Sequence, residues 1–253
     1  MEGVFPAIPT QFKEDLSIDI EATQKHTEAL LNNGIHGIVM LGTIGEGTSL
    51  TLSEKVEVLR ATVEVAGGKV PVLSGVAEFT TQGACDTVKA AGEAGVDGIM
   101  LLPAMVYNSD PRETIAHFRT VANSTHLPIM CYNNPPVYRV DITPEMFKEL
   151  IDVENIVVIK EASGNVPRIT DLFNALNDRF LIFAGLDDVA LESFMLGCTG
   201  WVSGLVDAFP QENRALWDAA MSGDYERALE IYRWYMPMLR FDSHPKLVQY
   251  IKL

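Results

Sequence analysis

Short apolar runs of strand length alternate with longer segments in which apolar residues recur at helical spacing. Runs of about four to eight apolar residues are typical of buried strands, whereas a period of about 3.6 residues is typical of amphipathic helices. No two successive runs are joined by a tight hairpin signal, so they are predicted to pair in parallel. The predicted strands are residues 3–8, 36–41, 70–74, 97–102, 127–132, 156–160, 180–184 and 200–203.

The segments between these runs carry the start signals of helices. Thr51 and Glu54 have the spacing of a capping box, in which each residue satisfies a backbone N–H of the other. Asp110 and Thr143 each precede a proline, which is favoured in the first turn of a helix. Helices are predicted at residues 17–33, 51–66, 80–94, 166–176, 187–197, 210–221 and 225–239, with two more beginning near 110 and 143.

This alternation of strands and helices predicts an α/β fold of the (β/α)8, or TIM barrel, type. A doubly wound open sheet is the alternative, but such sheets usually have fewer strands. Its dinucleotide-binding version carries a Gly-x-Gly-x-x-Gly turn after the first strand, and residues 10–13 contain no glycine. The barrel is predicted at residues 1–205. Additional C-terminal helices at residues 206–253 are expected to pack on it as part of a single structural unit.

The composition limits the possible partners and compartments. The chain has 253 residues, a net charge of −15 and a sequence pI near 4.7, which argues against nucleic acid and anionic membrane surfaces as partners. No uncharged run reaches the roughly 20 residues that a membrane span needs, and the N-terminus has no signal-peptide pattern. Cys85, Cys131 and Cys198 show no CxxC spacing, so free thiols in a reducing cytoplasm are expected.

In a barrel of this kind the chemistry lies at the C-terminal ends of the strands, and the sixth predicted strand ends in Lys160. A lysine at the rim of a sheet is partly removed from water, which disfavours its ammonium form and lowers its pKa. The neutral amine can attack a ketone and form a Schiff base. The alternative is an ordinary lysine that leaves the sheet for solvent, since surface lysines are the rule.

Other candidates at the same rim also have two interpretations. The glycine-rich stretch 42–46, which contains Thr43, is either a functional loop or only a tight turn, and it lacks the lysine of a phosphate-binding P-loop. Tyr132 is either a proton carrier or a core tyrosine with a satisfied hydroxyl. The five histidines are scattered without an HxH or HExxH pair, so a metal site is not expected and a metal-dependent hydrolase is disfavoured.

Three motifs occur in register along the chain: Gly-Thr-x-Gly-Glu at 42–46, Tyr-Asn-x-Pro at 132–135 and Ile-Lys-Glu-Ala-x-Gly at 159–164. With them the chain resembles, over essentially its whole length, the dihydrodipicolinate synthase/N-acetylneuraminate lyase family. The resemblance implies lyase chemistry of the class I aldolase type on a 2-oxo acid such as pyruvate. It also implies that the reaction needs neither a metal nor an organic cofactor.

The resemblance assigns roles to individual residues. Lys160 would form the Schiff base, Tyr132 would shuttle protons and hydrogen-bond the bound keto acid, and Thr43 would belong to the proton relay. The backbone after Gly42 would hold the substrate carboxylate, and Val202 would contribute a carbonyl near the imine. The residues expected to bind substrate are Ile44, Val202, Tyr107 and Arg139.

The chain departs from the synthase pattern in three places. Ile44 stands where the synthase has a second threonine, and Val137 stands where it has an arginine for the carboxylate of its aldehyde substrate. Arg139 is the nearest arginine to that position. Tyr107 follows an altered loop and matches poorly the tyrosine that the family shares across a subunit interface. These changes disfavour a lysine-pathway synthase. The Tyr-Asn-Asn-Pro loop at 132–135 resembles that of dehydratases and deaminases of sugar-derived or hydroxyproline-derived keto acids, such as the pyrroline-hydroxycarboxylate deaminase.

The predicted function is therefore a Schiff-base-forming lyase acting on a 2-oxo acid, by aldol cleavage or condensation, dehydration or deamination. Dihydrodipicolinate synthase proper, acting on pyruvate and aspartate semialdehyde, stays open, as does a catalytically silent barrel that binds a keto acid. The resemblance also implies a homo-oligomer, specifically a tetramer. Residues 244–253 look like an opening helix where family members continue with further helices, so the sequence is expected to be truncated at its C-terminus.

Overall fold

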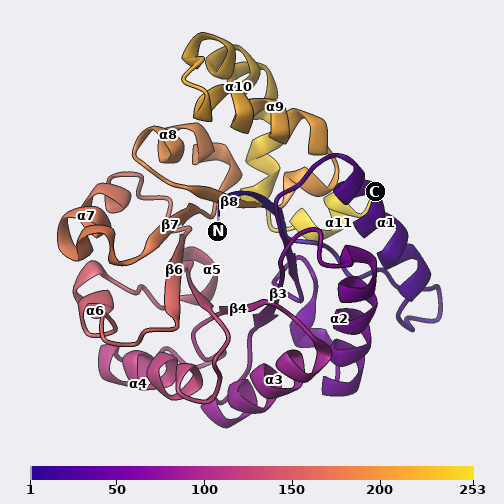
Figure 1. The fold of residues 1–253 in the computed structure, drawn as a ribbon, viewed down its shortest axis with the longest axis vertical. Helices are drawn as coiled ribbons and strands as arrows, with labels where there is room; N and C mark the ends of the chain where they lie inside the picture. The colour runs from indigo at the N-terminus through magenta and orange to yellow at the C-terminus, as the bar shows by residue number, and fades with distance from the viewer. Residues whose placement is uncertain (1) are drawn as a thin grey trace.

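Eight parallel strands form a barrel in the computed structural model, which describes residues 2–253 (Figure 1). The strands follow the order β1-β8-β7-β6-β5-β4-β3-β2, and a parallel bridge between Ala7 and Val39 joins the two ends of this order. The predicted TIM barrel is thereby confirmed. The strands are β1 Gly3–Pro6, β2 Ile38–Met40, β3 Val72–Val76, β4 Gly98–Leu101, β5 Ile129–Asn133, β6 Ile156–Glu161, β7 Leu181–Ala184 and β8 Gly200–Ser203.

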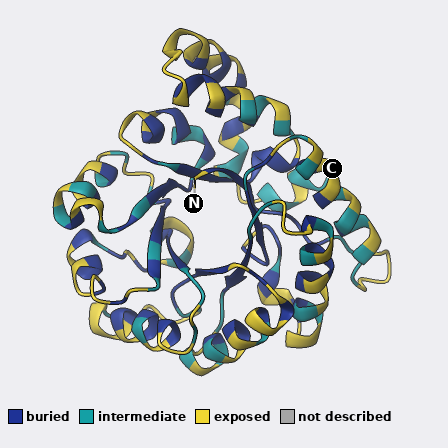
Figure 2. Ribbon diagram, viewed as in Figure 1, coloured by how far each residue is buried: buried dark blue, intermediate teal, exposed yellow. Residues whose placement is uncertain are grey.

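Helices surround the barrel, with one side buried against the strands and the other exposed (Figure 2). The helices of this ring are α1 Ile20–Asn32, α2 Leu52–Ala66, α3 Thr81–Ala94, α4 Pro111–Ala122, α6 Pro144–Lys148, α7 Pro167–Leu176 and α8 Ala190–Met195. Beyond the ring, α9 Pro210–Met221 packs against α8 and β1, and α10 Tyr225–Leu239 packs against α9. A short helix, α11 Leu247–Ile251, follows. Among residues 2–253, no helix combines the length and apolar character needed to cross a membrane.

The helix start signals read from the sequence are used as predicted. The Thr51 hydroxyl accepts a hydrogen bond from the Glu54 N–H at 3.4 Å, and the Glu54 carboxylate accepts one from the Thr51 N–H at 2.7 Å. Asp110 and Glu113 repeat the arrangement at the start of α4, with distances of 3.0 and 2.9 Å. Each pair satisfies two N–H groups that the helix itself leaves without a partner, which explains why the sequence predicts these two starts well.

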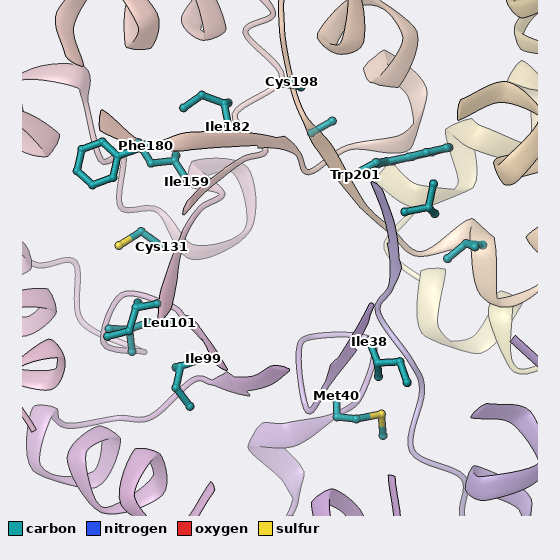
Figure 3. Close-up of a cluster of buried hydrophobic side chains, with 14 of the residues drawn as sticks. Ile38, Met40, Ile99, Leu101, Cys131, Ile159, Phe180, Ile182, Cys198 and Trp201 are labelled. Atoms are coloured by element: carbon teal, nitrogen blue, oxygen red, sulfur yellow. The ribbon is translucent and has the colours of Figure 1, made fainter. Parts of the chain in front are cut away.

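The hydrophobic core has two parts, because successive side chains along a strand point to opposite faces of the sheet. One set points outward, toward the surrounding helices, as Figure 3 shows for Ile38, Leu101 and Trp201. The other set fills the inside of the barrel. Cys131 and Cys198 are buried free thiols, as the sequence predicts.

Two phenylalanine rings fill the barrel near the amino ends of β2 and β8. The rings of Phe5 and Phe183 meet edge to face with their centroids 5.4 Å apart. A Cβ atom on Gly37 would lie 1.9 Å from the Phe5 ring, and one on Gly200 would lie 2.3 Å from the Phe183 ring. Both positions therefore have to be glycine for the two rings to fit inside the barrel.

Two segments differ from the sequence prediction. Residues 187–197, expected to form one helix, begin as a 3-10 turn at Asp187–Val189 before α8 starts. The reason is that Asp187 directs its carboxylate to β8, where it accepts a hydrogen bond from the Trp201 indole at 2.8 Å. A one-turn helix after β5, α5 Pro135–Tyr138, was not predicted at all.

Candidate active site

A cavity of about 440 Å³ lies at the C-terminal ends of the strands. Residues at or just after the ends of seven of the eight strands line it, including Ala7 after β1, Lys160 on β6 and Val202 on β8. Much of the remaining wall comes from residues 242–248, which run from the 3-10 turn after α10 into the start of α11. The cavity therefore lies at the end of the barrel where enzymes of this architecture carry their catalytic groups.

Lys160 reaches this cavity from β6, and only 5% of its surface is exposed. Its Nζ atom lies 3.8 Å from the centroid of the Tyr132 ring. Burial lowers the pKa of the amine to about 8, while the negative charges of Asp242 and Asp187 oppose this shift. At pH 7 about a tenth of an amine with this pKa is uncharged, a fraction on the order of a few hundred times that of an ordinary lysine. Lys160 is therefore suited to attack a carbonyl carbon.

Tyr132, on β5, presents a protonated hydroxyl to the same cavity. Asn134 donates a hydrogen bond from Nδ2 to the Tyr132 oxygen at 2.8 Å. Burial raises the pKa of Tyr132 well above its ordinary value, so the hydroxyl keeps its proton at physiological pH. Nothing in residues 2–253 accepts that proton, which leaves it available for a molecule in the cavity.

The hydroxyl of Thr43, in the loop after β2, is hydrogen-bonded to the hydroxyl of Tyr138 on α5. The rings of Tyr132 and Tyr138 meet edge to face, with centroids 5.6 Å apart and planes at 78°. Burial raises the pKa of Tyr138 to about 12. Thr43 and Tyr132 line the cavity, and Tyr138, which does not, contacts both of them.

The loop after β2 also offers free backbone donors. Thr43 and Ile44 line the cavity, and their N–H groups donate no hydrogen bond to another residue of the described chain. Successive free N–H groups in a tight turn form a site for anions. The turn is compact, since a Cβ atom on Gly45 would lie 2.6 Å from the Leu41 backbone nitrogen. This loop can hold a carboxylate without a cationic side chain.

Asn134 organises the segment that carries Tyr138. Its Oδ1 accepts a hydrogen bond from the Val137 N–H at 3.2 Å and so caps α5. Pro135 and Pro136 occupy the first turn, where their missing N–H groups cost nothing. The same Asn134 side chain holds the Tyr132 hydroxyl through Nδ2. One residue therefore fixes the positions of both tyrosines.

Two carboxylates lie near Lys160. Asp187 is fully buried and accepts hydrogen bonds from Trp201 Nε1 and Leu205 N, both at 2.8 Å. Asp242, from the short turn after α10, lines the cavity and accepts a hydrogen bond from the Asp187 N–H at 3.0 Å. Burial raises the pKa of Asp242 to about 6 and also raises that of Asp187. These charges set the electrostatic environment of the Lys160 amine.

The structure brings together five of the seven residues that the sequence assigned to the site. Those lining the one cavity are Lys160, Tyr132, Thr43, Ile44 and Val202. The other two lie elsewhere. Tyr107 is 84% exposed and lines a separate surface pocket with Phe79 and His117. Arg139 is exposed at the end of α5, where it adopts a left-handed backbone with φ of +61°. Val137, by contrast, does line the cavity.

Sequence reasoning missed three residues of the site. Tyr138 lies on a helix that no periodicity predicts, and Asp242 comes from a turn far along the chain from the barrel strands. Asp187 follows the end of β7, at the rim that the topology predicts, but no motif in the sequence assigns it a role. Across residues 2–253, no three His, Cys, Asp or Glu side chains gather in a way that could hold a metal ion.

Comparison with known proteins identifies similar sequences. Residues 1–252 match the model of the dihydrodipicolinate synthetase family. A 4-hydroxy-tetrahydrodipicolinate synthase of Methanosarcina mazei is 35% identical over 240 residues, covering 94% of this chain and 82% of that protein. A protein of the same name from Methanospirillum hungatei is 33% identical over 250 residues, covering 96% of this chain and 86% of that protein.

Solved structures agree with the sequence comparison. The crystal structure of dihydrodipicolinate synthase from Aquifex aeolicus superimposes with a TM-score of 0.93 at 31% identity, covering 98% of this chain and 86% of that one. The chloride-inhibited dihydrodipicolinate synthase from Acinetobacter baumannii, solved in complex with pyruvate, gives a TM-score of 0.93 at 27% identity. It covers 98% of this chain and 87% of that one.

Proposed function

The chain belongs to the dihydrodipicolinate synthetase family and is a Schiff-base-forming lyase that acts on a 2-oxo acid, and from this premise we propose that Lys160 carries the imine. The observation that carries the assignment is the position of its amine. It is buried beside the Tyr132 ring at 3.8 Å, with a pKa lowered to about 8. A lysine desolvated in this way is an activated nucleophile for a carbonyl carbon.

The neighbouring groups supply the rest of the reaction. The Lys160 nitrogen attacks the keto carbon, and the carbonyl oxygen leaves as water after taking up two protons, one of which comes from the amine. Tyr132 supplies and retrieves a proton as the general acid and base, with Thr43 beside it. The free N–H groups of Thr43 and Ile44 hold the carboxylate next to the keto carbon. Val202 contributes a backbone carbonyl close to the imine.

The other residues that line the cavity bear on the choice of substrate. Val137, Leu186 and Leu247 make much of it apolar, and Asp242 adds a carboxylate. Among the described lining residues, Lys160 is the only lysine or arginine. A second carboxylate on the substrate would be buried without a partner, which is costly. The proposed substrate is therefore a 2-oxo acid with a hydroxyl or amino group on the second carbon from the keto carbon. After the imine forms and the intervening carbon loses a proton, that group leaves as water or ammonia.

Condensation of pyruvate with aspartate semialdehyde is the competing candidate. It is favoured by the relatives at 33–35% identity that are named 4-hydroxy-tetrahydrodipicolinate synthase.

We also propose that the protein is a homo-oligomer in the cytoplasm. Exposed apolar side chains at the barrel rim, such as Phe79 and Val106, support self-association, and unpaired cysteines suit a reducing compartment. Light scattering after size-exclusion chromatography tests the oligomer.

Reduction by borohydride tests the imine directly. The protein is incubated with pyruvate, reduced, digested and examined by mass spectrometry. The Lys160 peptide should gain one carboxyethyl group, and Lys160→Ala should gain none. Lys89→Ala, which removes an exposed lysine on α3, should be labelled as fully as the wild type. Labelling that persists in Lys160→Ala would place the imine on another amine.

A further inference from the structure

We propose that Tyr138, from the same chain, supplies the second hydroxyl of the proton path that reaches the substrate through Thr43. The inference rests on the proposed function, because a proton path is needed only if Lys160 forms an imine. Neither the motifs nor the positional match to the family points to Tyr138. The geometry behind the cavity wall does, since the Tyr138 hydroxyl is hydrogen-bonded to the hydroxyl of Thr43, which lines the cavity.

The first step of the argument is that Tyr138 is held in place by its surroundings. Its ring packs edge to face against Tyr132 at 5.6 Å, a favoured arrangement of aromatic pairs. Asn134 caps the helix that carries Tyr138 through the Val137 N–H at 3.2 Å and binds the Tyr132 hydroxyl at 2.8 Å. A change in Asn134 would therefore disturb both hydroxyls together. The Tyr132 hydroxyl and the Tyr138 hydroxyl, the two proton donors of the proposed reaction, therefore depend on the same side chain for their positions.

The second step concerns the direction of the hydrogen bond. Burial raises the pKa of Tyr138 to about 12, so it is protonated at neutral pH and can donate to the Thr43 oxygen. Thr43 is then free to point its own proton at a molecule in the cavity, which it lines. A threonine hydroxyl is too weak an acid to stay ionised. It can therefore give a proton to the substrate only if another group replaces that proton at once.

The proton balance follows from this arrangement. As Thr43 gives its proton to the departing oxygen or nitrogen of the substrate, it takes the proton of Tyr138. Tyr138 is only partly buried and Thr43 is exposed, so solvent water returns the proton to the tyrosine. The reverse sequence removes a proton from the substrate. Tyr138 acts through Thr43 without touching the substrate, and it is therefore a positioning residue.

The rival source of this hydroxyl is Tyr107. In the described chain Tyr107 is 84% exposed and lies in a different pocket, with Phe79 and His117. It could approach Thr43 only from a second copy of the protein. Tyr138 needs no second copy, since its hydroxyl already contacts Thr43. If Tyr138 is the source, Tyr138→Phe should lower turnover and Tyr107→Phe should not. If Tyr107 is the source, the reverse is expected.

Tyr138→Phe is the central variant, because it removes the hydroxyl and keeps the ring against Tyr132. With the hydroxylated or aminated 2-oxo acid on which the wild type is most active, kcat should fall at least tenfold with little change in KM. Borohydride labelling of Lys160 with pyruvate should still reach completion. The solvent deuterium isotope effect on kcat should rise, because proton delivery becomes slower. Tyr225→Phe, an exposed tyrosine at the start of α10, is the matched control and should match the wild type.

A double-mutant cycle with Thr43→Val makes the test independent of how well any single variant folds. The combined variant should be little worse than Thr43→Val alone, because residues of one path are not additive. Thr43→Ser should restore the sensitivity to Tyr138→Phe. Additive losses, wild-type turnover in Tyr138→Phe, or a loss in Tyr107→Phe alone would each overturn the proposal. A wild-type protein that pyruvate does not label would instead refute the imine itself.

Discussion

Tyr132 and Lys160 are register partners on the adjacent parallel strands β5 and β6. Side chains of paired residues on neighbouring strands point to the same face of a sheet, so both enter the barrel side by side. The amine consequently lies over the tyrosine ring, 3.8 Å from its centroid. The pairing explains how a lysine can be desolvated and still have a proton donor next to it.

Tyr132→Phe keeps this packing and removes only the hydroxyl. Turnover should fall by about 10²–10⁴-fold, the usual contribution of a general acid or base. The imine should still form slowly, so borohydride labelling at long times should persist. Steady-state rates and labelling time courses measure the two effects. Turnover equal to that of the wild type would assign Tyr132 a structural role only.

The rate of imine formation should depend on pH through Lys160. Its pKa is lowered to about 8 by burial, and only the neutral amine attacks. Below pH 8 the neutral fraction, and with it the rate, should rise about tenfold per pH unit. Above pH 8 the rate should level off. Rapid-mixing labelling with pyruvate across this range gives the profile, and a break above pH 10 would mean that the amine is an ordinary solvated lysine.

Asp242→Asn should move that break to lower pH. The negative charge of Asp242 favours the ammonium form and opposes the lowering of the Lys160 pKa, so removing the charge should lower the pKa further. Below about pH 6 the variant and the wild type should form the imine at the same rate, because Asp242 is itself protonated in the wild type there. The asparagine keeps an oxygen acceptor for the Asp187 N–H. A break that moves upward, or does not move, contradicts this account.

Val137→Arg should change the choice of substrate. Val137 lines the cavity on α5 and is 56% exposed, so an arginine there can reach a distal carboxylate. The wild type should condense pyruvate with aspartate semialdehyde weakly, and the variant should gain at least tenfold in kcat/KM. Val137→Met controls for length without charge. A wild-type synthase rate of ~10 s⁻¹, an ordinary enzyme turnover, would show that no arginine is needed.

The sequence predicts the repeating parts of this molecule well. The strands and long helices are predicted from the spacing of apolar residues and from the capping boxes, which are both local signals. Thr51 with Glu54 and the apolar run before Lys160 are examples that the structure confirms. The positions of Lys160, Tyr132 and Thr43 around one cavity follow from barrel topology, since the carboxyl ends of all strands meet at one rim.

The parts that could not be predicted depend on contacts between distant segments. Asp187 leaves the expected helix because Trp201 and Leu205 bind its carboxylate. Asp242 reaches the cavity only through the packing of the helices that precede it. Tyr138 is placed by a cap on a single turn of helix, which is too short to show any hydrophobic period. Neither spacing nor composition encodes such relationships.

The Phe5 and Phe183 rings, packed against Gly37 and Gly200, limit the route by which substrate enters and product leaves the barrel. The two rings fill the barrel near the amino ends of β2 and β8. A molecule bound at Lys160 therefore has to leave through the opening by which it entered, at the carboxyl ends of the strands. A lingering product therefore blocks the next substrate and competes with it directly. Product release and substrate binding use the same opening, so each turnover has to wait for release of the previous product.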